Sequence, residues 1–518
     1  MRAAVTTGVT TALTTALTAV LAAGRRPGPG TGTAAAVPRL ARWPVGLIAG
    51  AVAAVHLVAG SLGRGYWFDE ALMLALGRHH LDWGSADQPP GAPLLARIAD
   101  TVAPGSIAVL RIVPSLATAA AVVVAAMIAR ELGGDRRAQT LTALAQATGI
   151  WVTLAGHWLT PYTLEPLGWL VLVWLVVRWM RVRDDRLLLA LGPVLGLSGQ
   201  VKFQVLLFAA VLLLAVLAVG PRDLLGRPAL WVSAAVATVI VAPTLLWQAA
   251  HGWPQLRMGA VVTAEAEALY GGRPGVALGL LWMAGVTGLV LVVAGLVFAV
   301  RDPRLRRYGF LALTFGALWL LFVIMAGRPY YLGGLHGALA ALGAVGFQHR
   351  RESGHRRWSW TVWPGAVLSV LAAAVTVPVS AQLAAPGIQD GVIAAVRQVW
   401  TEMPAEQRDR TVVVAESYIW AAFLDTAPPG TGLPPVVSGS RSYGYLDPPP
   451  DDRDSVIFVG ERPETIAPAI TGLHRAGVSD TGDTLLPPGS PGIPVWTGSG
   501  LARPWSQVWP ELRTLDVG

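Results

Sequence analysis

The 518-residue chain contains no cysteine and only one lysine, Lys202. The lack of cysteine excludes disulfide bonds, a thiolate nucleophile and any metal site built on cysteine. Charged residues are also scarce, at 14% of the chain, whereas hydrophobic residues make up 53%. A soluble protein of this length would carry far more charge. The composition therefore excludes an ordinary soluble domain.

Long apolar windows with almost no charge recur along the chain. Each is close to the roughly 20 residues that an α-helix needs to cross a bilayer. They lie near 44–62, 106–129, 138–157, 164–180, 187–200, 205–220, 229–249, 276–300, 308–326, 331–347 and 360–382. The sequence thus predicts a polytopic α-helical membrane protein with about 11 transmembrane helices.

Residues 1–42 precede these windows, and we expect them to form a disordered cytoplasmic tail because their second half is rich in Pro and Gly. Residues 1–23 also have the outline of a signal peptide, although their many threonines make them only weakly apolar. The sequence leaves these two interpretations open.

Every second loop between the windows is rich in arginine, as the positive-inside rule expects of cytoplasmic loops. The alternation predicts an odd number of spans and a cytoplasmic N-terminus. The net charge of +8 does not indicate a nucleic acid partner, because the arginines do not cluster on a polar domain. The arginine-rich loops hold Arg130, Arg136, Arg137, Arg178, Arg181, Arg183, Arg186, Arg222, Arg227, Arg301, Arg304, Arg306, Arg307, Arg350, Arg351, Arg356 and Arg357.

The remaining loops are predicted to face outward, and so is the segment 384–518. That segment is richer in Pro, Asp and Glu, and its runs "RTVVVAE" and "DSVIFVG" are typical of buried strands. With the helical stretch "IQDGVIAAVRQVWTEMP" before them, they predict a small extracytoplasmic α/β domain. The membrane domain then covers 43–383, and its first outer loop covers 63–105.

The unusual polar residues gather in the outward loops. "GRGYWFDEALMLA" opens the first loop with the adjacent acids Asp69 and Glu70, and Glu165 stands at the outer start of the fourth window. Lys202 and Arg328 lie in two other outer turns, "SGQVKFQV" and "GRPYYL". A carboxylate can act as a general base, and Lys or Arg can bind a phosphate. No His-rich spacing requires a metal.

The first loop, "YWFDEALMLALGRHHLDWGSADQPPGAPLLARIAD", resembles that of bacterial GT-C glycosyltransferases of the protein-mannosyltransferase and aminoarabinose-transferase kind. The resemblance continues through "LRIVPSLATAAAVVVAAMIARELGG", "LLWQAAHGWP", "GRPYYL" and "GLPPVVSGSRSY", so it covers about 44–460. It implies the GT-C fold and a sugar donor linked to polyprenyl phosphate. It also implies an acceptor outside the plasma membrane, a hydroxyl group of a lipid, glycan or protein.

The resemblance also implies roles for individual residues. Asp69 matches the catalytic carboxylate that deprotonates the acceptor hydroxyl. One base and one preformed leaving group suffice for a single displacement, which would invert the anomeric centre. Glu165, four residues before Trp169, matches a second carboxylate. Lys202 and Arg328, together with Tyr330, match contacts to the donor phosphate. Glu70 is a further catalytic candidate, although a structural role is equally compatible with its position.

Three motifs depart from the family pattern. "LE" at 164–165 replaces "FD", "KFQ" at 202–204 replaces "KYT", and Thr244 replaces an Asn. These departures concern the identity of the sugar or acceptor more than the reaction class.

Two other functions stay open at this level. A lipid or solute transporter or flippase would place ionisable groups near the bilayer midplane, whereas here they gather at one edge. A non-catalytic assembly subunit would keep the scaffold without the chemistry. Lys202 and Arg328 could also be interfacial anchors whose ammonium and guanidinium groups reach toward water.

Overall fold

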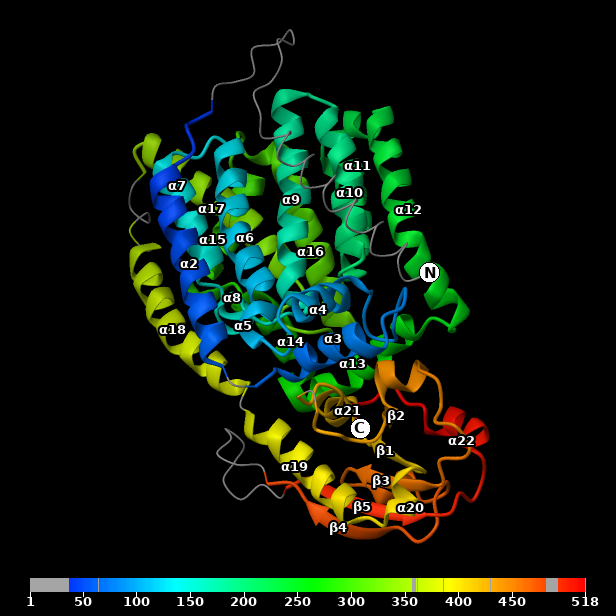
Figure 1. Ribbon diagram of the computed structural model, residues 1–518. Helices are drawn as coiled ribbons and strands as arrows, with labels where there is room; N and C mark the ends of the chain where they lie inside the picture. The colour runs from blue at the N-terminus through cyan, green and yellow to red at the C-terminus, as the bar shows by residue number, and fades with distance from the viewer. Residues whose placement is uncertain are drawn as a thin grey trace.

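The computed structural model describes residues 37–63, 65–355, 360, 362–384, 386–428, 430–480 and 492–517. The predicted tail lies outside these residues except for 37–42. Figure 1 shows three layers: long helices above, short helices lying across their lower ends, and a sheet domain beneath.

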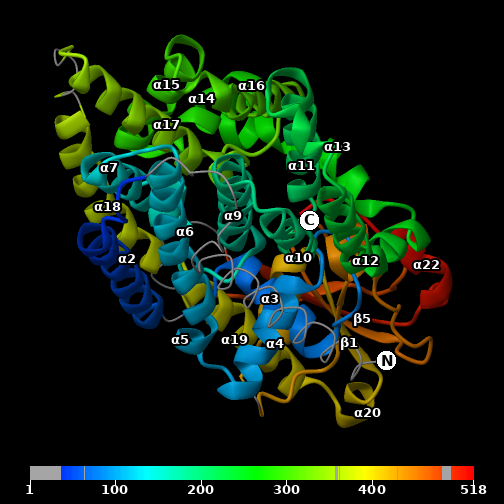
Figure 2. The ribbon, with the colours of Figure 1, turned by 90° about the horizontal axis from the view of Figure 1, so that it is seen from above.

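The long helices form the membrane domain. Within a bilayer an α-helix satisfies its own backbone hydrogen bonds, so apolar segments of this length form helices. They are α2 (Arg42–Leu62), α6 (Ile112–Glu131), α7 (Arg136–Ala147), α9 (Pro161–Val182), α10 (Arg186–Gly199), α11 (Gln204–Val219), α12 (Pro228–Ala250), α15 (Gly285–Arg301), α16 (Gly309–Ile324), α17 (Gly333–Glu352) and α18 (Val362–Leu383). The most apolar part of α9 is 67% buried, against 22% for α12. Figure 2 accordingly shows α9 near the middle of the bundle and α12 at its rim.

Short helices cover the lower end of the bundle (Figure 1). They are α3 (Phe68–His79), α4 (Gly91–Val102), α5 (Ile107–Leu110), α8 (Ile150–Ala155), α13 (Pro254–Tyr270) and α14 (Gly272–Trp282). Two 3-10 helices, η1 (Arg222–Leu224) and η2 (Arg306–Tyr308), lie in the arginine-rich loops.

The multi-pass architecture predicted from the sequence is confirmed, although the number of spans is not. Within the described residues, six helices are long and apolar enough to cross a membrane, or seven if the bent pair α14–α15 is one span. Helices α10 and α11 are apolar but shorter. Each of the eleven predicted windows contains helix, and the figure of eleven spans stays a prediction.

Two predicted windows are broken helices rather than continuous spans. The window 138–157 divides into α7 and α8, and the window 276–300 divides into α14 and α15, which meet at an angle of 92°. The two breaks contact each other, because the amide of Ile150 donates a hydrogen bond to the carbonyl of Met283 at 3.0 Å. Gly285 adopts a φ of +74°, which suits glycine at this sharp turn.

The small C-terminal sheet domain is also confirmed. Its sheet has the strand order β2-β1-β3-β5-β4. Strand β1 (Thr411–Ala415) is parallel to β2 (Val436–Ser438) and to β3 (Ser455–Val459). Strand β5 (Pro494–Ser499) is antiparallel to β3 and to β4 (His474–Val478). The strands β1 and β3 are buried along their whole length, as is usual for strands covered on both faces.

Helices cover both faces of this sheet. Helix α19 (Pro386–Glu402) packs Val392 and Val396 against Val413 and Ile457 on one face. Helix α22 (Trp505–Leu512) packs its two tryptophans on the other face. The remaining elements are α20 (Ala405–Arg408), α21 (Tyr418–Asp425), η3 (Arg441–Tyr445) and η4 (Pro463–Thr465).

Helices α15 and α17 pack with their backbones in close contact. A Cβ atom at Gly343 of α17 would overlap the carbonyl of Leu291, and one at Gly295 of α15 would overlap the carbonyl of Leu339. Small residues of this kind allow membrane helices to approach without intervening side chains.

We expect Gly343→Ile to separate α15 from α17 and to lower the stability of the purified protein by about 3 kcal/mol or more, because a backbone carbonyl cannot move aside as a side chain can. Thermal unfolding in detergent measures this loss. The control is Gly316→Ile on α16, an exposed glycine whose added Cβ would meet no atom within 4 Å. Equal losses in both variants would contradict the packing argument.

Candidate active site

A cavity of about 630 Å³ lies between the helical bundle and the sheet domain. All five loops predicted to face outward contribute to its wall, through residues that include Asp69, Tyr162, Lys202, Glu265 and Arg328. The sheet domain closes the other side with Tyr418, Ile419, Arg441, Asp516 and Val517. The tertiary fold therefore brings loops from along the whole chain to one chamber.

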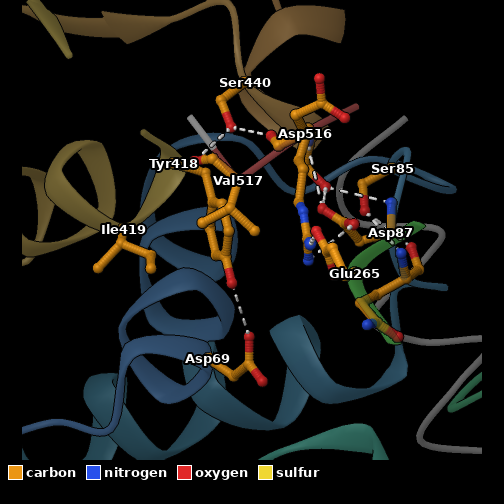
Figure 3. A network of polar contacts seen from close by, with 12 residues as sticks. Asp69, Ser85, Asp87, Glu265, Tyr418, Ile419, Ser440, Asp516 and Val517 are labelled. Carbon is orange, nitrogen blue, oxygen red and sulfur yellow. Dashed lines mark hydrogen bonds and ion pairs between the residues drawn. The ribbon is translucent and has the colours of Figure 1, made fainter. Parts of the chain in front are cut away.

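Asp69 stands in the first turn of α3, where the positive end of the helix dipole favours a carboxylate. It lines the cavity and accepts a hydrogen bond from the Tyr418 hydroxyl at 3.3 Å (Figure 3). Burial raises the pKa of Asp69 to about 6; Arg441 and the hydroxyls of Tyr162 and Tyr418 lower it, and Asp87 raises it. Such a carboxylate is ionised at neutral pH yet more basic than an ordinary aspartate, as a general base requires.

Glu70 occupies a different environment, although it is the next residue. It is fully buried and forms a two-pronged ion pair with Arg111, at 3.0 Å to Nε and 2.5 Å to Nη2. Its carboxylate also accepts hydrogen bonds from the amides of Trp67 and Leu159, each at 3.0 Å. Glu70 does not line the cavity. The geometry thus favours a structural role over the catalytic one considered from the sequence.

Glu165 and Lys202 form an ion pair at the edge of the cavity, with 3.1 Å between Oε2 and Nζ. Lys202 lines the cavity and Glu165 stands behind it. The ammonium group also lies 4.6 Å from the ring centre of Tyr331 and 5.4 Å from that of Tyr330. A carboxylate and two aromatic faces therefore fix the direction of the only lysine.

Two arginines from distant segments share one acid. Glu265, on α13, pairs with Arg328 through one carboxylate oxygen and with Arg441 of the sheet domain through the other, the latter at 3.1 Å. Arg441 also lies 3.9 Å from Asp87. Both guanidinium groups border the cavity. This cluster gives the chamber two fixed cations besides Lys202.

Aromatic residues form much of the remaining wall. Tyr330 stacks on Trp151, with 4.2 Å between ring centres and 13° between planes. Trp67 donates an indole hydrogen bond to the Tyr162 hydroxyl at 2.8 Å. Burial raises the pKa of Tyr330 well above 10, so its phenol stays protonated and can donate a hydrogen bond.

Four of the six residues predicted from the sequence line the cavity: Asp69, Lys202, Arg328 and Tyr330. Glu165 supports one of them, and Glu70 points elsewhere. The sequence argument missed Glu265, Asp87, Arg441 and Tyr418. Asp87 and Arg441 lie within the motifs "SADQPP" and "SGSRSY" and could have been noticed there, whereas nothing in the sequence distinguished Tyr418.

The chain is similar to a known family over part of its length and to solved structures in its fold. A family model described as dolichyl-phosphate-mannose-protein mannosyltransferase matches residues 87–247, and no curated protein matches the chain. The apo structure of ArnT from Cupriavidus metallidurans is 13% identical with a TM-score of 0.62, over 89% of this chain and 98% of that one. The structure of ArnT from the same organism bound to undecaprenyl phosphate is 14% identical with a TM-score of 0.59, over 88% and 98%. The fold implied by the first-loop motif is thus confirmed.

We expect Glu70→Gln to destabilise the protein strongly, because Arg111 would stay buried without its counter-charge. The loss of one partner of a buried ion pair costs about 3–5 kcal/mol. The matched variant is Asp69→Asn, one residue away, which should keep or slightly raise the unfolding temperature because burial disfavours the ionised carboxylate. Thermal unfolding in detergent compares the two. If both variants lost the same stability, the assignment of a structural role to Glu70 but not to Asp69 would be wrong.

Proposed function

We propose that this chain, a multi-pass membrane glycosyltransferase with the GT-C fold, moves a sugar from a polyprenyl-phosphate donor to a hydroxyl group of an acceptor outside the cytoplasm. The observation that carries the proposal is the chamber at one end of the bundle, where a basic carboxylate and three cations face the same space. We place this end of the bundle, and the sheet domain below it, outside the plasma membrane because the arginine-rich loops lie at the other end.

The cations suit the phosphate of the donor. Lys202, Arg328 and Arg441 border the cavity, and each is held by a carboxylate that fixes its direction before any ligand enters. Donors aimed in advance at developing negative charge give the largest catalytic stabilisation. The fold is shared with ArnT, which has been solved with undecaprenyl phosphate. We assign the same class of lipid phosphate to this chamber.

The wall of the cavity also suits an isoprenoid chain close to the phosphate. Helix α13 contributes the apolar residues Met258, Val262 and Leu269 to it. An isoprenoid tail that lies along this helix would keep its apolar surface away from water while the phosphate reaches the cations.

The reaction then needs one base and one leaving group. The acceptor hydroxyl gives its proton to Asp69 as its oxygen bonds to C1 of the sugar. The bond from C1 to the phosphate oxygen breaks, and its electron pair stays on the phosphate, where Lys202 and Arg328 stabilise the new charge. A single displacement of this kind inverts the anomeric centre. The acceptor hydroxyl belongs to a lipid, glycan or protein.

A transporter remains the alternative because two broken helices meet in the bundle, a feature of transporter binding sites. The pocket beside these breaks is small, about 30 Å³, and its wall includes Gly149, Met283 and Ala284. Mass spectrometry of envelope lipids, glycans and proteins with and without the gene separates the two functions. A glycosyltransferase removes a sugar from one carrier and adds its mass to another, whereas a transporter only redistributes unchanged molecules.

We expect Asp69→Asn to lower the transfer rate by about 10²–10⁴-fold, the usual contribution of a general base, while the fold is retained. In the wild type, the rate should fall as the pH drops through about 6, because protonated Asp69 cannot accept the proton. Product formation in membranes, measured against pH, tests both. The control Asp82→Asn removes an exposed carboxylate of the same loop and should behave as the wild type. A normal rate for Asp69→Asn would remove it from the mechanism.

We expect Lys202→Gln to weaken the binding of undecaprenyl phosphate about tenfold or more, because a charge-assisted hydrogen bond to the phosphate is lost. Binding of that lipid to the purified protein measures the effect. Arg257→Gln is the control: it removes a positive charge from α13, but Arg257 is exposed and donates to the Tyr445 hydroxyl instead. Unchanged affinity in Lys202→Gln would exclude this lysine from the donor site.

A further inference from the structure

Two residues of the sheet domain reach the catalytic chamber from equivalent positions. Tyr418 stands three residues beyond the end of β1 at Ala415, and Arg441 stands three residues beyond the end of β2 at Ser438. The strands β1 and β2 are parallel neighbours, so their carboxyl ends lie side by side at one edge of the sheet. This is the edge at which open α/β sheets place their functional residues. Here that edge faces the membrane domain.

The sheet domain docks on the helix that carries Asp69. Helix α21 begins at Tyr418, and its residues Ala421 and Phe423 share one apolar cluster with Leu72 and Leu76 of α3. The hydroxyl of Ser417 caps α21 by accepting a hydrogen bond from the amide of Ile419. The start of α21 is therefore fixed over the start of α3, and Figure 3 shows Tyr418 pointing from one to the other.

Arg441 holds the Tyr418 ring in place. Its guanidinium carbon lies 4.9 Å from the ring centre. The same guanidinium group forms ion pairs with Glu265 on α13 and Asp87 in the first loop. The backbone of Arg441 has a φ of +47°, and its amide donates to the carbonyl of Thr514 at 2.8 Å. A non-glycine residue keeps such a conformation only where its surroundings enforce it.

We propose that Tyr418 is a positioning residue for Asp69, and that the sheet domain thereby completes the catalytic site of the membrane domain. The hydrogen bond from the Tyr418 hydroxyl to Oδ1 fixes the carboxylate within the chamber. This inference rests on the role of base proposed above for Asp69. It gives the domain after the last span a part in catalysis besides any part in recognising the acceptor.

The pKa of Asp69 depends on several neighbouring groups, of which the Tyr418 hydroxyl is one. Arg441 from η3, Asp87 from the first loop, Tyr162 from α9, Tyr330 from the turn before α17 and Tyr418 from α21 all act on it. A hydrogen bond donated to a carboxylate favours its charged form. Removal of the Tyr418 hydroxyl alone therefore raises the pKa of Asp69 and leaves the four other groups in place.

Infrared titration of Asp69 tests the proposal without a substrate. The carboxyl band of protonated Asp69 is obtained as the difference between wild type and Asp69→Asn, and its loss is followed as the pH rises. In Tyr418→Phe, the midpoint should move upward by about 0.5–1 pH unit, the value of one hydrogen bond of ordinary strength. Phenylalanine keeps the ring beneath Arg441, so the docking of α21 is preserved.

Tyr443→Phe is the matched control. Tyr443 is a buried tyrosine of the same domain whose hydroxyl donates to Asp425 at 2.7 Å and does not border the chamber. It should leave the Asp69 midpoint unchanged. An unshifted midpoint in Tyr418→Phe, or an equal shift in both variants, would overturn the proposal.

A second measurement covers the case in which Tyr418→Phe gives little folded protein. The pH dependence of transfer, normalised to its own maximum, does not depend on the amount of enzyme in the membrane. Its acidic limb should move upward in Tyr418→Phe and stay in place in Tyr443→Phe. An acidic limb that coincides with that of the wild type would again overturn the proposal. Failure of the proposed function is distinct, since it would appear as the absence of any sugar transfer by the wild type. Failure of the role of Asp69 as base would appear as normal transfer by Asp69→Asn.

Discussion

The buried ion pair between Glu70 and Arg111 holds the first loop on which the rest of the site depends. Arg111 also donates to the carbonyls of Gly60 and Gly65, and Glu70 accepts from the amide of Leu159, so one pair joins the end of α2, the start of α3 and the segment before α9. A buried pair is stabilising only when its remaining polar groups are also satisfied, as they are here. Since α3 starts at this point, the pair also fixes the place of Asp69.

The charged side chains of the chamber are strong local charges that nearly neutralise one another in pairs. Lys202 has Glu165, and Arg328 and Arg441 share Glu265, so the cations are oriented without an uncompensated positive field. Among the residues that the structure describes, Asp69 forms no ion pair with an arginine; it accepts a hydrogen bond from the Tyr418 hydroxyl and feels Arg441 only as a nearby charge. These two arrangements serve opposite needs, since a phosphate site requires fixed cations and a base requires a carboxylate that still attracts a proton.

The site belongs to the bundle and to the sheet domain together. Helix α21 joins the two through apolar contacts with α3, and the neighbouring strand ends aim Tyr418 and Arg441 at the same chamber. Loops at the carboxyl ends of parallel strands are free to carry function because the strands themselves supply the rigidity. The loops of the membrane domain also rest on rigid elements, because the helices that carry them pack closely through glycines such as Gly295 and Gly343.

The sequence by itself determined the membrane class, the sheet domain, the family resemblance and four residues of the chamber, because hydrophobic windows and short motifs are local properties. Through the family motif it favoured Asp69 over Glu70 as the base, but it could not show that these adjacent acids have opposite surroundings. It did not reveal the breaks in α7–α8 and α14–α15, since each half keeps the apolar pattern of a continuous span. Tyr418 was invisible for the same reason: its role arises from the docking of two domains, and only the tertiary structure decides which distant side chain reaches a given carboxylate.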